Sequence, residues 1–436
     1  MPENNNTLIS MKKILLAALA LATGLGFTAC SSEPTADIAV YGWYKWDPEQ
    51  VSEDSLRANY EMWKQHGMVG VCVECGGFQL DRIQTAARLA HEAGLEYHAW
   101  VPSMLQGGQD STWYTVNRLG QSAYTKENRA YVEYYQTVDP HNPEVVKYLA
   151  ENYAKVAEIP EVDYVQLDYI RYADVILSEG LWVKYDTIIS HDWGKLEGWC
   201  ADKDCKTCKN HGEDDCKAKA AGKCCEKKAV PTGAKPEGVN EFPGADYCYC
   251  DACVADFKAK SGIDVREELK KGVDPATIEG WAQFRCDNVT NCVNVIVEAV
   301  HAKGKKVSAD VFPGPKSYAE WMVRQQWQKW NVDAYFPMNY NDFYLRGPQW
   351  VGRVTREEVE TVEGKPVYSG LFICHDWENK RGDIDPENSG LVPSEIAAAV
   401  QAAREAGAAG ICLFCPNHMT EAHWAEFDKA IGLKSK

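Results

Sequence analysis

Short apolar runs recur along the chain from residue 38 to its end. Each run is apolar at nearly every position, unlike the alternating pattern of a half-exposed strand. Continuous runs of this kind are typical of parallel strands that are covered on both faces. The pattern predicts eight buried parallel strands, at 38–44, 69–75, 95–101, 164–170, 306–312, 333–340, 367–373 and 410–415.

Helical patterns lie between these runs. In 79–93 the apolar residues recur three or four positions apart, so they fall on one face of a helix. Asn142 before Pro143 predicts the start of a second helix, because asparagine is a good N-cap and proline is favoured at the first helical position. Ser394 is predicted to cap a third helix that ends before Gly407.

Strands that alternate with helices predict one (β/α)8 TIM barrel over 38–436. A doubly wound open sheet is the alternative, and it is disfavoured because no glycine-rich phosphate-binding turn follows the first strand. The chain exceeds the roughly 250 residues of a typical barrel. The surplus lies mainly in a long, cysteine-rich insertion at 174–279, between strands four and five, and a smaller excursion occupies 103–141. Both leave from the strand ends at which barrel active sites lie.

The N-terminal part of the chain is typical of an export signal. Lys12 and Lys13 precede an apolar stretch that closes at Cys30, after a small residue, as at a bacterial lipoprotein cleavage site. An ordinary secretory signal is the alternative. We expect 1–30 to be removed, 31–37 to form a polar tether, and Cys30 to carry a lipid that anchors the protein in the cell envelope, facing the periplasm or the exterior.

Charge and cysteine content narrow the partners. The formal charge of −17 argues against nucleic acid or an anionic membrane surface as the partner. Nine of the 17 cysteines fall within 200–253. Cys205, Cys208, Cys250 and Cys253 have the paired spacing of a structural zinc site. Disulfides fit an exported protein equally well, so zinc and disulfides both stay open.

The segment VQLDYIRY (165–172) carries the main chemical signal. Asp168 and Arg171 stand in or beside an apolar strand, where a charge is costly unless it is paired or used. A carboxylate at the end of a strand is a common feature of barrel active sites. A structural ion-pair network is the alternative reading of the two charges.

Further polar and aromatic residues follow the other predicted strands. Several carboxylates beside aromatic residues favour hydrolysis of glycosidic bonds by a carboxylate pair, with no cofactor for catalysis and a carbohydrate as substrate. We expect Asp168 to be the nucleophile or charge stabiliser and Asp310 the acid/base, with Asp342 and Glu74 in reserve. The candidate substrate-binding residues are Arg171, Tyr172, His98, Trp100, Asn339, Tyr340, His375 and Trp377.

Five segments of the chain resemble those of a known family. These segments are GLEYHAWVP (94–102), VDPHNPEVVKYL (138–149), VDYVQLDYIRYA (162–173), WAQFR (281–285) and QQWQKWNVDAYFPMNYND (325–342). In these segments the chain resembles the bacterial family-10-like glycosidases. The resemblance implies a TIM-barrel glycosidase that acts on a polysaccharide or a cell-envelope glycan, with Asp168 in a central position. One departure is that related chitinase-type hydrolases carry a glutamate where this chain has Ile170.

Two other functions are open at this point. The missing acid at Ile170 is compatible with a non-catalytic glycan-binding lipoprotein. A metal-dependent deacetylase or amidase would instead need His98, His375 and His418 to cluster around Asp168. A second carboxylate oxygen about 5–10 Å from Asp168 across an open cleft would favour the hydrolase, whereas its absence would favour the glycan-binding protein.

Overall fold

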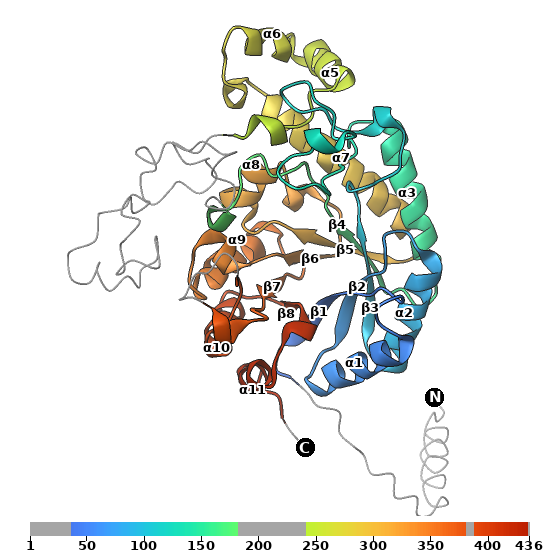
Figure 1. Ribbon diagram of the computed structural model, residues 1–436, viewed down its shortest axis with the longest axis vertical. Helices are drawn as coiled ribbons and strands as arrows, with labels where there is room; N and C mark the ends of the chain where they lie inside the picture. The colour runs from blue at the N-terminus through green and yellow to red at the C-terminus, as the bar shows by residue number, and fades with distance from the viewer. Residues whose placement is uncertain (1–35, 182–240, 381–387, 435–436) are drawn as a thin grey trace, which may run out of the picture. The chain divides into compact units, whose positions relative to one another are not determined.

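The computed structural model describes residues 36–181, 241–380 and 388–434, which belong to one compact unit, 34–435. The predicted export signal at 1–30 and the cysteines Cys205 and Cys208 lie outside the described residues. Within them, parallel strands alternate with helices (Figure 1). The strands are β1 (Ala39–Lys45), β2 (Gly70–Glu74), β3 (Glu96–Pro102), β4 (Tyr164–Asp168), β5 (Lys306–Val311), β6 (Ala334–Pro337), β7 (Tyr368–Phe372) and β8 (Gly410–Phe414).

These strands form one sheet in the order β6-β5-β4-β3-β2-β1-β8-β7. The two ends of the sheet approach each other, because Tyr335 in β6 forms a parallel bridge with Val367 and donates its amide to the carbonyl of Pro366 at 3.0 Å. The sheet is therefore a nearly closed barrel, and the predicted (β/α)8 architecture is confirmed for the described part of the chain.

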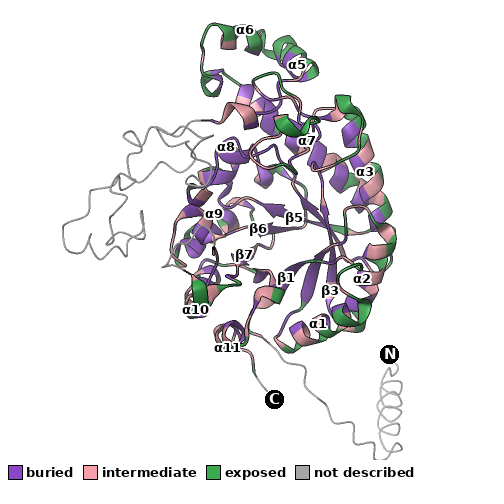
Figure 2. Cartoon of the chain, in the orientation of Figure 1, coloured by how far each residue is buried: buried purple, intermediate pink, exposed green. Residues whose placement is uncertain are grey.

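Helices cover the outside of this barrel, with their apolar faces turned to the sheet and exposed residues outward (Figure 2). They are α1 (Glu53–Gln65), α2 (Leu80–Glu92), α3 (Pro143–Ala157), α7 (Trp281–His301), α8 (Glu320–Val323), α9 (Trp350–Thr361), α10 (Pro393–Glu405) and α11 (Glu421–Ala430). Two further helices, α5 (Asp251–Ser261) and α6 (Val265–Lys270), lie beyond one end of the barrel (Figure 1). None of the helices in the described ranges is long and apolar enough to cross a membrane.

The predicted helix starts were right in one case and wrong in another. Asn142 caps α3 as predicted, since its side-chain oxygen accepts the amide of Glu144 at 2.9 Å. The predicted cap Ser394 lies inside α10, which begins at Pro393. Glu395 accepts the amide of Val392 at 3.1 Å and thereby satisfies a donor at the true start of the helix.

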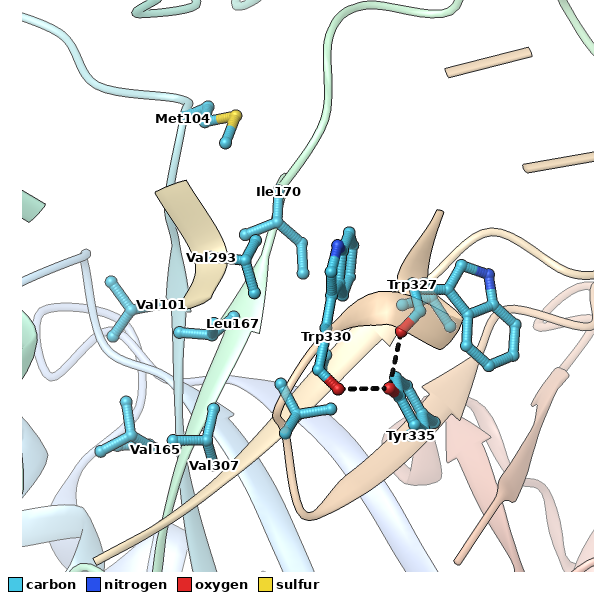
Figure 3. Close-up of a cluster of buried hydrophobic side chains, with 14 of the residues drawn as sticks. Val101, Met104, Val165, Leu167, Ile170, Val293, Val307, Trp327, Trp330 and Tyr335 are labelled. Atoms are coloured by element: carbon cyan, nitrogen blue, oxygen red, sulfur yellow. Dashed lines mark hydrogen bonds between the residues drawn. The ribbon is translucent and has the colours of Figure 1, made fainter. Parts of the chain in front are cut away.

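Strand β4 ends at Asp168, earlier than the predicted 164–170, because Tyr169 adopts a left-handed backbone conformation with φ of 49°. This turn interrupts the alternation of side chains along the strand. Ile170 is fully buried in an apolar cluster that includes Val293 of α7 and Trp330 (Figure 3). The side chain at the position where chitinase-type hydrolases carry a glutamate thus packs into this cluster.

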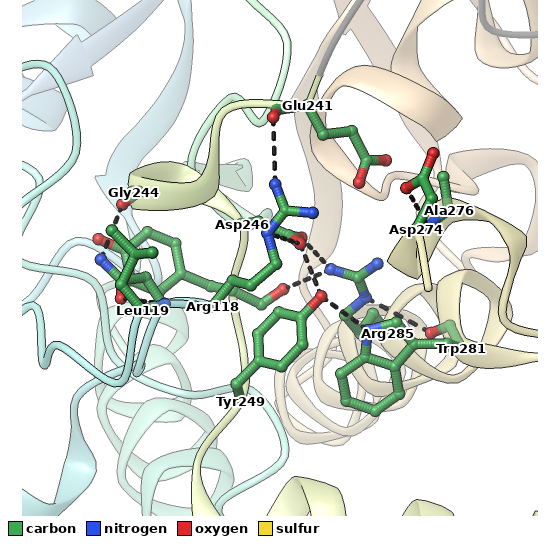
Figure 4. A network of polar contacts seen from close by, with 12 residues as sticks. Arg118, Leu119, Glu241, Gly244, Asp246, Tyr249, Asp274, Ala276, Trp281 and Arg285 are labelled. Carbon is green, nitrogen blue, oxygen red and sulfur yellow. Dashed lines mark hydrogen bonds and ion pairs between the residues drawn. The ribbon is translucent and has the colours of Figure 1, made fainter. Parts of the chain in front are cut away.

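The described end of the insertion is held to the barrel by a buried ionic network (Figure 4). Asp246 is fully buried and pairs with Arg285 of α7, and Arg118 and Arg324 lie within 3.6 and 3.9 Å of its carboxylate oxygens. Tyr249 also donates its hydroxyl to this carboxylate at 2.6 Å. Although burial opposes ionisation, the arginines, with Arg285 foremost, keep the pKa of Asp246 below its usual range.

We expect Asp246→Asn to lower the free energy of unfolding by about 3–5 kcal/mol, because it leaves the fully buried guanidinium of Arg285 without its counter-charge. Urea denaturation measures this loss. Asp251→Asn is the matched control, since Asp251 pairs with Arg266 while its own side chain is 93% exposed, and an exposed pair contributes at most about 1 kcal/mol. Equal losses in the two variants would contradict the expectation.

Candidate active site

The interior of the barrel is lined by alternate residues of each strand. Tyr41 and Trp43 of β1, Trp100 of β3 and Phe336 of β6 belong to one buried cluster inside the sheet. Side chains two residues apart face the same side of a strand. Tyr164 of β4 packs against this cluster, and Asp168 lies four residues further along the same strand. Asp168 therefore faces the interior at the carboxyl end of β4.

Asp168 and Asp310 are neighbours on adjacent strands. Leu167 of β4 is in register with Ala309 of β5, and the two aspartates are the next residues along these strands. Adjacent strands lie about 4.8 Å apart, so the two carboxyl groups share one end of the barrel. Asp168 is 7% exposed and Asp310 is 3% exposed. The structure thus places a second carboxyl beside Asp168.

Each carboxyl is oriented by the indole of a tryptophan. Trp100 donates its Nε1 hydrogen to Asp168 Oδ2 at 2.9 Å, and Trp43 donates to Asp310 Oδ1 at 3.0 Å. The left-handed turn aims the amide of Tyr169 at Asp168 Oδ1, at 2.6 Å. Both oxygens of Asp168 therefore accept hydrogen bonds, whereas the buried Oδ2 of Asp310 has no hydrogen-bond partner among the described residues.

The two environments separate the acidities of the pair. Burial raises the pKa of Asp310 well above its usual range, and the charge of Asp168 raises it further. Burial also raises the pKa of Asp168, but four groups oppose that shift, namely the amide of Tyr169, the indole of Trp100, Arg171 and Lys45. When the pair carries one proton, it resides preferentially on Asp310. In hydrolase sites, two carboxyl groups with different pKa values serve as the acid and the carboxylate in this way.

Aromatic side chains surround the mouth of the barrel above this pair. The rings of Tyr340, Phe372 and Phe414 are partly exposed, and their centroids lie 5.1 to 5.7 Å apart. Asp310 and Asp168 both contribute to raising the pKa of Tyr340, after burial, so the Tyr340 hydroxyl lies near the pair. Nζ of the exposed Lys45 lies 5.5 Å from the ring centroid of Trp100. We call Tyr340, Phe372 and Phe414 the aromatic rim.

The two reserve carboxylates are engaged in local structure. Glu74 lies at the end of β2, and its Oε1 accepts the amides of Gly76 and Gly77 at 2.7 and 2.8 Å. Asp342 forms a buried ion pair with Lys380 at 2.7 Å and accepts the amide of Gly390 at 2.9 Å. Asp342 therefore holds the loops after β6 and β7 together.

Arg171 and Tyr172 do not face the carboxyl pair. Arg171 forms a buried ion pair with Asp174 at 2.8 Å and hydrogen-bonds the hydroxyl of Tyr135 at 3.0 Å. The charge of Arg171 favours a lower pKa of Asp168, but burial outweighs it and the net shift of that pKa is upward. After burial, the groups that raise the pKa of Tyr172 most are Asp139 and nearby cysteines, so the phenol lies at their cluster.

His98 and the amide nitrogen of Asn339 form their hydrogen bonds away from the carboxyl pair. His98 is buried inside the barrel, with its ring nitrogens 2.9 Å from Ser308 Oγ and 3.0 Å from Glu96 Oε1, toward the amino ends of the strands. Asn339 donates to Ser369 and Glu358 at 2.9 and 3.0 Å, between the barrel and α9. Among the predicted substrate-binding residues, Trp100 and Tyr340 are the ones that lie at the carboxyl pair.

His375 and Trp377 lie in the loop after β7, at a surface hollow that is also lined by Thr420 and Glu421. His375 stands against His418, with 5.0 Å between ring centroids. Within the described ranges, the side chains grouped closely enough to hold a metal ion are Asp139, Cys248, Cys250 and Cys253. The histidine cluster required by the deacetylase hypothesis does not form around Asp168.

Sequence reasoning missed Trp43, Lys45, Phe372 and Phe414 at this end of the barrel. Trp43 lies near the carboxyl end of β1 at an inward position, two residues beyond Tyr41. Strand alternation is the signal that would have found it, because the first strand is unambiguous and its parity fixes which side chains face the interior.

Comparisons with known proteins bear on the fold. No protein-family model matches the chain, and no curated protein matches it in sequence. The PgaB (BpsB) glycoside hydrolase domain from Bordetella bronchiseptica is similar over 92% of this chain and 100% of that domain, with a TM-score of 0.56 and 12% identity. The catalytic domain of β-amylase from Paenibacillus polymyxa is similar over 91% and 98%, with a TM-score of 0.50 and 11% identity. The chain therefore has the TIM-barrel fold found in these glycoside hydrolase domains.

Proposed function

We propose that the protein is a glycoside hydrolase that cleaves glycosidic bonds in a polysaccharide or a cell-envelope glycan. The observation that carries this proposal is the pair of inward-facing carboxyl groups, Asp168 and Asp310, at the carboxyl ends of β4 and β5 with separated acidities. Glycoside hydrolysis requires one carboxylic acid and one carboxylate beside the scissile bond. The names of the two structural neighbours support a carbohydrate substrate.

The environments assign the two roles. Asp310 keeps its proton and donates it to the departing glycosidic oxygen. Asp168, held by the indole of Trp100 and the amide of Tyr169, is the carboxylate that attacks the anomeric carbon or stabilises its positive charge. The aromatic rim provides apolar faces for the sugar rings, and Trp100 positions Asp168. These residues perform the chemistry without a cofactor.

The proposal is tested by incubating the purified full chain with a panel of soluble polysaccharides and cell-envelope glycans and measuring new reducing ends. We expect release from at least one glycan by the wild type and none by Asp168→Asn. Equal release by both proteins would remove Asp168 from the chemistry.

A non-catalytic glycan-binding protein is the second candidate. It is favoured by the low exposure of both carboxyl groups, which are 7% and 3% exposed. In the same panel this candidate is recognised by retention of a glycan without any release of reducing ends. A Tyr340→Ala variant then weakens retention, because an aromatic face contacts the sugar in either function.

We also propose that the protein is exported and anchored in the cell envelope through a lipid on Cys30, which rests on the sequence at 12–30 alone. Cys30→Ala is expected to move the protein from the detergent-extracted membrane fraction to the soluble fraction, because lipidation adds about 0.8 kcal/mol of membrane affinity per buried methylene. Immunoblots of fractionated cells measure the shift. A membrane-bound Cys30→Ala protein would contradict anchoring at this residue.

A further inference from the structure

Three cysteine side chains converge on one carboxylate oxygen outside the barrel. Cys248, Cys250 and Cys253 place their sulfur atoms 3.2, 3.1 and 3.4 Å from Oδ2 of Asp139. The four potential ligand atoms all lie within 4.8 Å of one another. Asp139, Cys248 and Cys253 are buried and Cys250 is partly buried. We call this group the Cys3Asp cluster.

The geometry points to an ion bound by all four side chains rather than to hydrogen bonds alone. One carboxylate oxygen has two lone pairs, and a thiol is a weak donor, so three thiols on a single oxygen exceed what that oxygen can accept well. A tetrahedral zinc ion with its usual bond lengths separates sulfur from oxygen by roughly 3.6 Å and sulfur from sulfur by roughly 3.8 Å. The sulfur-to-oxygen distances of the cluster match the first value to within about half an ångström.

Backbone amides already face these ligands. Val116 directs its amide at the sulfur of Cys248, and Cys253 directs its own at the sulfur of Cys250, both at 3.4 Å. The other oxygen of Asp139 accepts the amide of His141 at 3.0 Å. Donors of this kind orient metal ligands and stabilise the negative charge of thiolates.

We propose that Asp139, Cys248, Cys250 and Cys253 bind a structural zinc ion. Three thiolates and a carboxylate fill all four positions of a tetrahedral site, which is typical of structural rather than catalytic zinc. The three thiols lose their protons to solvent when the metal binds. Sulfur-rich donor sets select zinc over calcium or magnesium. A disulfide between any two of these cysteines would instead leave the third beside the carboxylate.

The proposed ion connects two segments that are distant in sequence. Asp139 lies just before α3, at the end of the excursion after β3, whereas the cysteines lie at the start of α5 in the insertion after β4. The two segments already pair, because Tyr249 donates its amide to Val116 at 2.7 Å and Asn117 forms a bridge with Tyr247. The zinc ion fastens the insertion to the excursion, and this inference does not depend on the proposed glycosidase activity.

The test measures the metal content of the full chain and of its variants. We expect Cys250→Ser and Asp139→Asn to contain one zinc equivalent less than the wild type after equilibration with zinc. Cys286→Ser, at a buried cysteine of α7, is the matched control and keeps the wild-type content. The comparison isolates this site from any metal bound by other cysteines. Substitution by Co²⁺ gives thiolate charge-transfer absorption that decreases in Cys250→Ser and not in Cys286→Ser.

A second measurement uses the wild type alone, in case the variants fold poorly. Peptides that carry Cys248, Cys250 and Cys253 are expected to resist alkylation until a chelator is added, and chelation is expected to lower the Tm. Equal metal content in Cys250→Ser and Cys286→Ser, alkylation that is independent of the chelator, or a disulfide between two of these cysteines in a non-reducing peptide map would overturn the proposal.

Discussion

Asp168→Asn is expected to lower kcat by roughly 10³-fold or more, as is usual when a group that contacts the reacting atoms is neutralised. The variant loses the negative charge at the carboxyl end of β4 but keeps the size of the side chain. Its single oxygen can accept from Trp100 or from Tyr169, but not from both. This mismatch costs about 1–3 kcal/mol, which a domain of ordinary stability tolerates. Reducing-end assays and circular dichroism on the same preparation measure both effects.

Asp342→Asn provides the matched control for Asp168→Asn. It also neutralises a buried aspartate that follows a barrel strand, but this aspartate pairs with Lys380. Breaking a buried ion pair lowers the free energy of unfolding by about 3–5 kcal/mol, while kcat of the folded variant stays within a few-fold of wild type. The opposite result, with activity lost in Asp342→Asn and retained in Asp168→Asn, would move the catalytic carboxylate to the loop after β6.

The positions of the strands could be predicted because a barrel imposes a strong pattern on the sequence. Strands covered on both faces must be apolar throughout, so every predicted run overlaps an observed strand, and β1 and β3 each extend one residue beyond the predicted run. The largest differences are at the ends of two strands, since β4 ends at Asp168 and β6 at Pro337, two and three residues before the predicted ends. Tyr169 takes a left-handed conformation that no residue pattern marks, because tyrosine rarely adopts it. The strand therefore ends at Asp168, and the side chains after it no longer alternate between the two faces of the sheet as predicted.

That turn also explains why the site was predicted only in part. Asp168 and Asp310 lie within strands, where parity decides which way a side chain faces. Arg171 and Tyr172 follow the turn and face Asp174 and the Cys3Asp cluster. Residues just beyond a strand end have no such constraint, so proximity in sequence to Asp168 did not mean proximity to the pair.

The cysteines illustrate a second limit of sequence reasoning. Spacing identified Cys250 and Cys253 as candidate ligands, and the structure brings them together with Cys248 and Asp139. Asp139 could not be found from spacing, because it lies more than a hundred residues from these cysteines and in a different excursion. The predicted partners Cys205 and Cys208 lie outside the described residues, so their role stays a prediction.

The second large effect is expected for Asp310→Asn, which should lower kcat by about 10²–10⁴-fold, the usual contribution of a general acid. The amide has the shape of the protonated acid, and its oxygen can still accept from Trp43. It cannot donate a proton to a leaving oxygen. Substrates with activated aryl leaving groups need little protonation, so we expect them to recover much of the lost rate in Asp310→Asn but not in Asp168→Asn. Equal losses on both kinds of substrate would exclude Asp310 as the acid.

The stability of Asp310→Asn as a function of pH provides a readout that is independent of activity. In the wild type, burial and the charge of Asp168 raise the folded-state pKa of Asp310 far above its value in the unfolded chain. Between these two pKa values the native state binds more protons than the unfolded state, so the free energy of unfolding decreases as pH rises. Asparagine does not titrate and removes this contribution. Urea denaturation at pH 5 and pH 8 should therefore show a smaller decrease in Asp310→Asn than in the wild type, and an unchanged decrease would mean that Asp310 is ionised in the native protein.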